Sequence, residues 1–194
     1  MNLSKIEQLI IESNPKEIKW VTLERIAQIT TGEHIDISDI LSVGDYPAYL
    51  GALRIARYHN QFNTEANTII IQSTGPKAGY VNFIATEFWA GPFCYIIKLT
   101  TKKINNRFLY YYLKTKEEDL SNMKTSNRFA IISKNKLQKF FIPILPLKLQ
   151  EQIVQSLDNM NVVGALLEEE VKAWKEEQDK HAKKIFATIW ERTI

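Results

Sequence analysis

The sequence predicts an α+β fold in which a globular mixed α/β domain over residues 1–146 is followed by one long C-terminal coiled-coil helix over residues 147–194. Three observations support this prediction. Short apolar runs between residues 44 and 100 alternate with glycine- and proline-containing turns, which is typical of strands and loops. Apolar residues recur at helical spacing on both sides of that region. After Pro146 the chain has no further proline and keeps an apolar repeat over about five heptads.

Two short helices are expected before the strand-rich region. Residues 3–10 place apolar side chains at helical spacing, and Pro15 should end that helix. Residues 20–32 are expected to form the second helix, which Gly32 ends. The apolar face of this second helix consists of Leu23, Ile26, Ala27 and Ile29.

The middle of the chain is expected to alternate strands with turns. β-Branched and aromatic residues fill its short apolar runs. The expected strands are residues 68–72, 79–83, 94–99, 129–132 and 140–144. Turns are expected at residues 73–76 and 90–92, and residues 106–114 have the spacing of a helix.

The C-terminal repeat predicts a helix from Ile153 to Trp190, roughly 57 Å long at ~1.5 Å per residue. Such a helix needs a partner helix, from this chain or another, to bury its apolar stripe. The residues expected to make this contact are Ile153, Leu157, Met160, Leu167, Val171, Trp174, His181 and Ile185. His181 is interpreted as a polar residue that sets the register.

Charge is unevenly distributed along the chain. Residues 98–148 carry 12 Lys and Arg residues against 3 Asp and Glu residues, a net charge of +9, whereas the segments on either side each carry a net charge of −3. A basic middle segment favours either a phosphate-facing surface or an ordinary solvated face. The single cysteine, Cys94, fits a reducing cytoplasm, and no apolar stretch is long enough to span a bilayer, so a membrane partner is not expected.

No catalytic or metal-binding constellation is apparent. The glycine-rich residues 73–79 lack the Gly-Lys-Ser/Thr ending of a P-loop, and no His, Cys, Asp or Glu residues have the spacing of metal ligands. Cys94 lies in an apolar run, where thiols are usually inert. We therefore expect neither an enzyme nor a bound cofactor, although a small nuclease with a helical dimerisation tail remains an alternative.

Three groups of residues are candidates for DNA contact. Arg and Asn suit bidentate reading of base edges, small residues let a backbone approach phosphates, and a mixture of Lys, Arg and Asn suits backbone positioning. The base-reading candidates are Arg54, Arg57 and Asn60. The candidates in and near the glycine-rich turn are Lys77 and Tyr80, and those in the basic segment are Lys124, Asn127, Arg128 and Lys134.

Three stretches together resemble the specificity subunits of type I restriction-modification systems. The first contains PKEIKWVTLERI, residues 15–26, and ends at Gly32. The second combines NRFLYYYLK, residues 106–114, with NRFAIIS, residues 127–133. The third and most specific is FIPILPLKLQEQIV, residues 141–154, which continues into the heptad helix. The resemblance covers nearly the whole chain, but only one of the two recognition units and one of the two long helices that are usual in this family.

The resemblance implies a non-catalytic, target-recognising role. It makes residues 1–146 a target-recognition domain and residues 147–194 a helix for dimerisation and subunit docking. The implied partners are double-stranded DNA, a methyltransferase subunit that binds S-adenosylmethionine, and a restriction subunit. A homodimer joined through the helices would read a bipartite palindromic site. An alternative is a regulator that pairs with a full-length specificity subunit.

Overall fold

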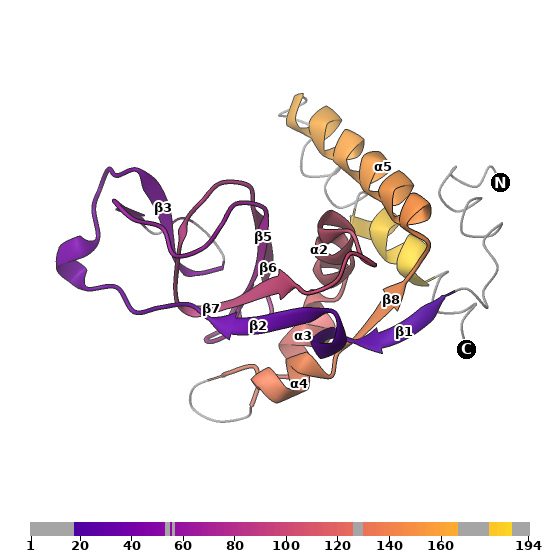
Figure 1. Ribbon diagram of the computed structural model, residues 1–194, viewed down its shortest axis with the longest axis horizontal. Coiled ribbons are helices and arrows are strands. Elements are labelled where there is room, and N and C mark those ends of the chain that lie inside the picture. The colour runs from indigo at the N-terminus through magenta and orange to yellow at the C-terminus, as the bar shows by residue number, and fades with distance from the viewer. Residues whose placement is uncertain (1–17, 53–54, 56, 126–129, 167–178, 188–194) are drawn as a thin grey trace. The chain divides into compact units, whose positions relative to one another are not determined.

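The computed structural model describes residues 18–52, 55, 57–125, 130–166 and 179–187 of the chain (Figure 1). Its contacts define two compact units, each built from segments that are separate in the sequence. The first, here called the sheet unit, comprises residues 22–101 and 116–141. The second, the helical unit, comprises residues 1–21, 102–115 and 142–194. The domain boundary at residue 146 stays a prediction.

The sheet unit is organised around one long strand, β7. Its sheet has the order β4-β3-β7-β5-β6, and β2 also pairs with β7. β3 runs parallel to the first half of β7, whereas β2 and β5 run antiparallel to its second half. The strands are β2 (Ala27–Thr31), β3 (Tyr46–Gly51), β4 (Arg57–His59), β5 (Thr68–Gln72), β6 (Val81–Ile84) and β7 (Trp89–Leu99).

Buried isoleucines hold the strands around β7 in register. Ile97 of β7 faces Ile29 of β2 on one side and Ile69 of β5 on the other. All three side chains are buried. β-Branched side chains pack well on a pleated surface, so this row of cross-strand pairs fixes which face of the sheet turns inward.

A second cluster fills the space between β3 and the neighbouring strands. Tyr49 and Phe88 meet edge to face with ring centroids 5.6 Å apart, a geometry that aromatic quadrupoles favour. The cluster consists of Tyr49, Ala52, Ile70, Ile84, Phe88, Ala90 and Cys94. Burial raises the pKa of the Cys94 thiol to about 12, so this side chain is a small buried apolar group and not a reactive thiolate.

The expected helix over residues 20–32 is wrong. This segment forms the end of β1 (Lys19–Thr22), a single 3-10 turn η2 (Leu23–Arg25) and then β2. The apolar residues of the segment fit helical spacing, but β2 also alternates buried and exposed residues along its first positions. Pairing with β7 supplies the hydrogen bonds and the buried surface that decide the conformation, as tertiary context commonly does.

The turn expected at residues 90–92 is also wrong, because these residues lie inside β7. Gly91 serves close packing: a Cβ on this residue would come within 2.8 Å of Leu50 Cα in β3. The strand expected at residues 129–132 is reduced to isolated bridges at Ile131 and Ile132. The strands expected at residues 68–72, 79–83, 94–99 and 140–144 are present with shifted ends.

Three further short helices complete the described part of the sheet unit. They are η3 (Ile37–Asp39), α3 (Glu117–Asn122) and α4 (Lys134–Gln138). Leu120 of α3 and Leu137 of α4 are fully buried. The helices α3 and α4 therefore anchor the chain on both sides of residues 123–133.

The helical unit joins a small sheet to helices. β1 pairs with β8 (Phe141–Ile144). The expected helix over residues 106–114 is confirmed as α2 (Asn106–Thr115), and α5 (Leu147–Leu166) begins directly after Pro146. In the described residues no helix is long and apolar enough to cross a membrane.

Two polar side chains of α5 fix it beside α2. The side chain of Gln150 is fully buried; its Oε1 accepts from the N–H of Asn105 at 2.7 Å, and its Nε2 donates to Leu145 O at 2.7 Å and to Lys103 O at 3.1 Å. About two helical turns further along α5, the carboxylate of Asp158 accepts hydrogen bonds from Arg107 and Tyr111 of α2.

The long straight C-terminal helix is not confirmed. Residues 179–187 are helical, and Phe186 packs on Phe108 and Tyr112 of α2 with ring centroids 5.5 and 5.0 Å away. Asp158 bonds to the same two turns of α2. A straight helix would separate Asp158 from Phe186 by roughly 42 Å at ~1.5 Å per residue. The two described segments are therefore not parts of one straight helix in this structure, and Figure 1 shows both near α2.

Candidate nucleic-acid interface

Residues 73–80, here called the glycine loop, present Lys77 to solvent. Gly75 and Gly79 have φ values of +87° and +102°, which favour glycine over any other residue. A Cβ at Gly79 would also lie 2.7 Å from the backbone nitrogen of Ser121 in α3. The glycine loop is therefore a tight turn pressed against α3, and Lys77 stands exposed at its outer end.

Backbone hydrogen bonds join the glycine loop to the basic segment that follows α3. Gly75 N–H donates to Ala130 O at 2.8 Å, and Ile132 N–H donates to Ser73 O at 2.9 Å. The hydroxyl of Tyr95 in β7 donates to Ile132 O at 2.8 Å. Two segments that are nearly sixty residues apart in sequence thus lie side by side and are fixed to the central strand.

This junction gathers three of the predicted DNA-contacting lysines. Lys124 pairs with Ile132 through an isolated bridge, and its Nζ lies 3.5 Å from Pro76 O in the glycine loop. Lys134 follows two residues after Ile132, at the start of α4. We call Lys77, Lys124 and Lys134 the lysine surface. Asn127 and Arg128 were predicted to contribute to the same surface and lie outside the described residues.

The acidic side chain of Glu117, near the glycine loop, is hydrogen-bonded to the backbone. Glu117 of α3 accepts a hydrogen bond from Val81 N–H at 2.7 Å. A carboxylate held in this way stabilises the strand that follows the glycine loop. The predicted contact residue Tyr80 is half-buried and packs against the core cluster of the sheet unit, which favours a packing role.

The base-reading candidates occupy a different part of the sheet unit. Arg57 lies on β4, where it pairs with Ala48 of β3, and Asn60 follows the same strand; both are exposed. Arg54 lies outside the described residues. The β3–β4 hairpin is thus the second candidate contact region, separate from the lysine surface.

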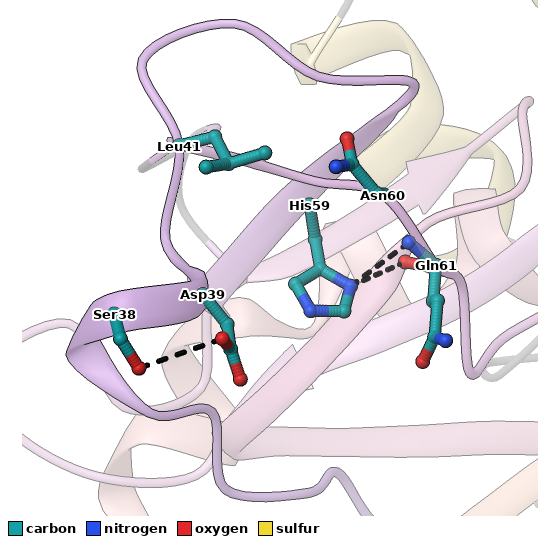
Figure 2. A pocket seen from close by; sticks show the side chains of 6 residues that line it. All are labelled: Ser38, Asp39, Leu41, His59, Asn60 and Gln61. Carbon is teal, nitrogen blue, oxygen red and sulfur yellow. Dashed lines mark hydrogen bonds between the residues drawn. The ribbon is translucent and has the colours of Figure 1, made fainter.

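A cavity of about 300 Å³ opens beside this hairpin. Its lining residues are Ser38, Asp39, Leu41, His59, Asn60 and Gln61, and Figure 2 shows their side chains around the ring of His59. That ring is held by a hydrogen bond of 3.0 Å from Gln61 N–H to Nδ1 and by packing on Trp89, with centroids 4.5 Å apart. His59 therefore acts here as a fixed wall of the cavity.

Sequence reasoning missed three side-chain amides that hold the backbone of the sheet unit. Asn63 accepts from Ala90 N–H at 2.7 Å and donates to Ala90 O at 3.0 Å. Gln72 accepts from Ala52 N–H at 2.6 Å, and Asn82 donates to Ala52 O at 3.0 Å. The only signal in the sequence was a polar residue at a position within or next to an apolar run.

The residues predicted for dimerisation divide into two groups. Ile153, Leu157 and Ile185 are fully buried within the single chain, and His181 is half-buried. This part of the stripe is therefore covered without a second chain. The side chains of Met160, Leu167, Val171 and Trp174 lie outside the described residues, and their contact with another chain stays a prediction.

A sheet unit that presents Lys77 on a glycine-built turn, beside the half-buried Lys124 and Lys134, has the make-up of a nucleic-acid-binding domain. In the described part of the chain, no group of three or more His, Cys, Asp or Glu residues is arranged to hold a metal ion. Comparison with known proteins gives the family. A family model described as the type I restriction modification DNA specificity domain matches residues 15–173, and the chain belongs to this family.

Individual relatives agree with that assignment. A putative type I restriction enzyme specificity subunit of Haemophilus influenzae is 30% identical over 84% of this chain and 41% of its own length. The type I restriction-modification S subunit from M. genitalium superposes with a TM-score of 0.73 at 21% identity, over 96% of this chain and 48% of the other. A chain from a structure on assembly and conformational transition of the type I R-M system gives a TM-score of 0.65 at 21% identity, over 97% and 50%. The chain therefore spans about two fifths to one half of the length of these relatives.

Proposed function

We propose that this chain recognises a specific DNA sequence for a type I restriction-modification complex and contributes no catalytic group of its own. The observation that carries the proposal is the lysine surface, in which the glycine loop with Lys77 is hydrogen-bonded to the basic segment with Lys124 and Lys134. Lysines on a fixed backbone suit phosphate contact, which sets position and register on the duplex.

Base reading is assigned to the β3–β4 hairpin. Arg57 and Asn60 are exposed and carry the donor and acceptor patterns that match guanine and adenine edges in the major groove. In this division of roles, the lysine surface supplies affinity for any duplex and the hairpin supplies discrimination. Arg54, Asn127 and Arg128 are included in the proposal on sequence grounds.

The proposed partners are double-stranded DNA, a methyltransferase subunit and a restriction subunit. S-Adenosylmethionine would be bound by the methyltransferase subunit. A homodimer is proposed for the chain as given, with the part of the heptad stripe between Met160 and Trp174 as the contact. Two identical recognition domains would then read a bipartite palindromic site, because each would read its half-site in the same way.

A methylation assay tests this function. The methyltransferase subunit should methylate duplex DNA only when the chain is added, and sequencing of the methylated positions should show one recurring site. An asymmetric bipartite site would contradict the homodimer and indicate pairing with a different recognition domain. Cleavage of DNA by the purified chain in the presence of Mg²⁺, abolished by changing one of its own carboxylates, would instead support the small nuclease.

A further inference from the structure

Gln72 links the two regions that the proposed function assigns to DNA. Its backbone closes the glycine loop, because its N–H donates to Tyr80 O at 2.8 Å and its carbonyl accepts from Gly79 N–H at 2.9 Å. Its side-chain Nε2 donates to Thr74 O inside the loop at 3.0 Å. Its Oε1 reaches across to the end of β3 and accepts from Ala52 N–H at 2.6 Å.

Asn82 completes the attachment at the end of β3. Its Nδ2 donates to Ala52 O at 3.0 Å, while its Oδ1 accepts from Phe83 N–H at 2.9 Å. Ala52 is fully buried, and a buried backbone N–H and carbonyl must find partners. Here both partners are side-chain amides from β5 and β6, at the point where β3 leaves the ladder with β7.

Gly51 makes this attachment possible. A Cβ on this residue would lie 2.2 Å from Gln72 Oε1 and 2.7 Å from Nε2, so any larger residue would push the amide away. The register between β3 and β7 also shifts between Tyr49 and Gly51, an irregularity that turns the end of the strand. The absence of a side chain at Gly51 and the reach of Gln72 are therefore complementary.

We propose that Gln72 is a positioning residue that holds the β3–β4 hairpin in register with the glycine loop. This inference rests on the proposed function, since it assumes that the hairpin reads bases while the loop contacts phosphates. A phosphate contact fixes where the protein sits on the duplex, and base reading succeeds only if the hairpin meets the correct base pair from that position. Through Ala52, Gln72 sets the offset between the two.

Two variants remove the link by different routes. Gln72→Leu deletes both amide hydrogen bonds, and Gly51→Ala expels the amide while leaving Gln72 intact. The matched control is Gln28→Leu, the same change on an exposed strand residue. The full chain is first given a random 30-base-pair duplex library, and the selected duplex is then compared with a scrambled duplex of the same length.

Both variants should lower the ratio of selected to scrambled affinity about tenfold, within the range expected for losing one base-reading contact. Affinity for the scrambled duplex and its salt dependence should stay unchanged, because the backbone hydrogen bonds of residue 72 to Tyr80 and Gly79 still close the glycine loop that carries Lys77. The double variant should be no worse than Gln72→Leu alone, since both changes remove the same contact. Hydrogen exchange at the Ala52 amide should accelerate in both variants and not in Gln28→Leu.

Three results would overturn the proposal. The first is an unchanged affinity ratio in Gln72→Leu, and the second is an equal loss of affinity for both duplexes, which would indicate a purely structural role. The third is unaltered exchange at Ala52. If the wild-type chain selects no sequence, with or without the methyltransferase subunit, the proposed function fails instead, and the exchange measurement still decides whether Gln72 anchors Ala52.

Discussion

Replacing Gln150 by leucine should destabilise the helical unit without changing its packing volume. The wild-type amide makes three hydrogen bonds to the backbone and is fully buried. A typical intramolecular hydrogen bond contributes about 1 kcal/mol, so Gln150→Leu should lower the free energy of unfolding by about 3 kcal/mol. For a chain of this size each kcal/mol shifts the melting temperature by about 2–4 °C, which predicts a fall of roughly 6–12 °C.

Thermal and urea unfolding followed by far-ultraviolet circular dichroism would measure this effect. Gln152→Leu is the matched control, because it makes the same change two residues along the same helix at a half-buried position. That control should change stability by less than about 0.5 kcal/mol. A loss below about 1 kcal/mol in Gln150→Leu, or equal losses in the two variants, would refute the view that these three bonds hold the start of α5.

Three other predictions follow from the site and the sequence. Lys124→Ala should weaken binding to every duplex and reduce the slope of log affinity against log salt by about one unit, whereas the same change at the exposed Lys180 should not. Binding titrations at several salt concentrations measure this slope, and an unchanged slope in Lys124→Ala would show that Lys124 does not contact the DNA. Because burial raises the pKa of Cys94 to about 12, the contribution of the neutral thiol to stability should be complete below pH 9 and be lost as the pH rises toward 12. Urea unfolding across that range should show a free energy of unfolding that falls with pH, and rapid labelling of the native chain by a thiol reagent at pH 8 would contradict the burial. Leu167→Asp combined with Val171→Asp should give monomers in sedimentation, and a wild-type chain that is already monomeric at micromolar concentration would remove the basis for a homodimer.

Local patterns predicted those elements whose own short stretch of sequence fits only one conformation. The α2 helix carries its own apolar face, and the strand at residues 68–72 is a short β-branched run. Residues 20–32 were mistaken for a helix because a short apolar segment fits both periodicities. Only the pairing of β2 with β7, about seventy residues later, separates the two, and one sequence does not display that pairing.

The candidate site was predictable in its chemistry but not in its connections. The glycines around Lys77 and the basic residues near Lys124 could be identified from sequence, because turns and charges are local properties. Their association depends on bonds such as Gly75 to Ala130, between residues whose spacing carries no signal. The amide of Gln72 was missed for the same reason, since its partner Ala52 is twenty residues away.

The attachment of the hairpin has a consequence for how such a protein acquires a new target. Gln72 and Asn82 grip only the peptide N–H and carbonyl of Ala52, groups that every residue except proline offers. Arg57 and Asn60, which follow Ala52 in the sequence, take no part in these two hydrogen bonds, and both are exposed instead of packed in the core. Exchanging those side chains therefore costs the framework little stability. On the proposed function, molecules with the same scaffold can then diverge in the bases they read, provided the residue before Ala52 stays small.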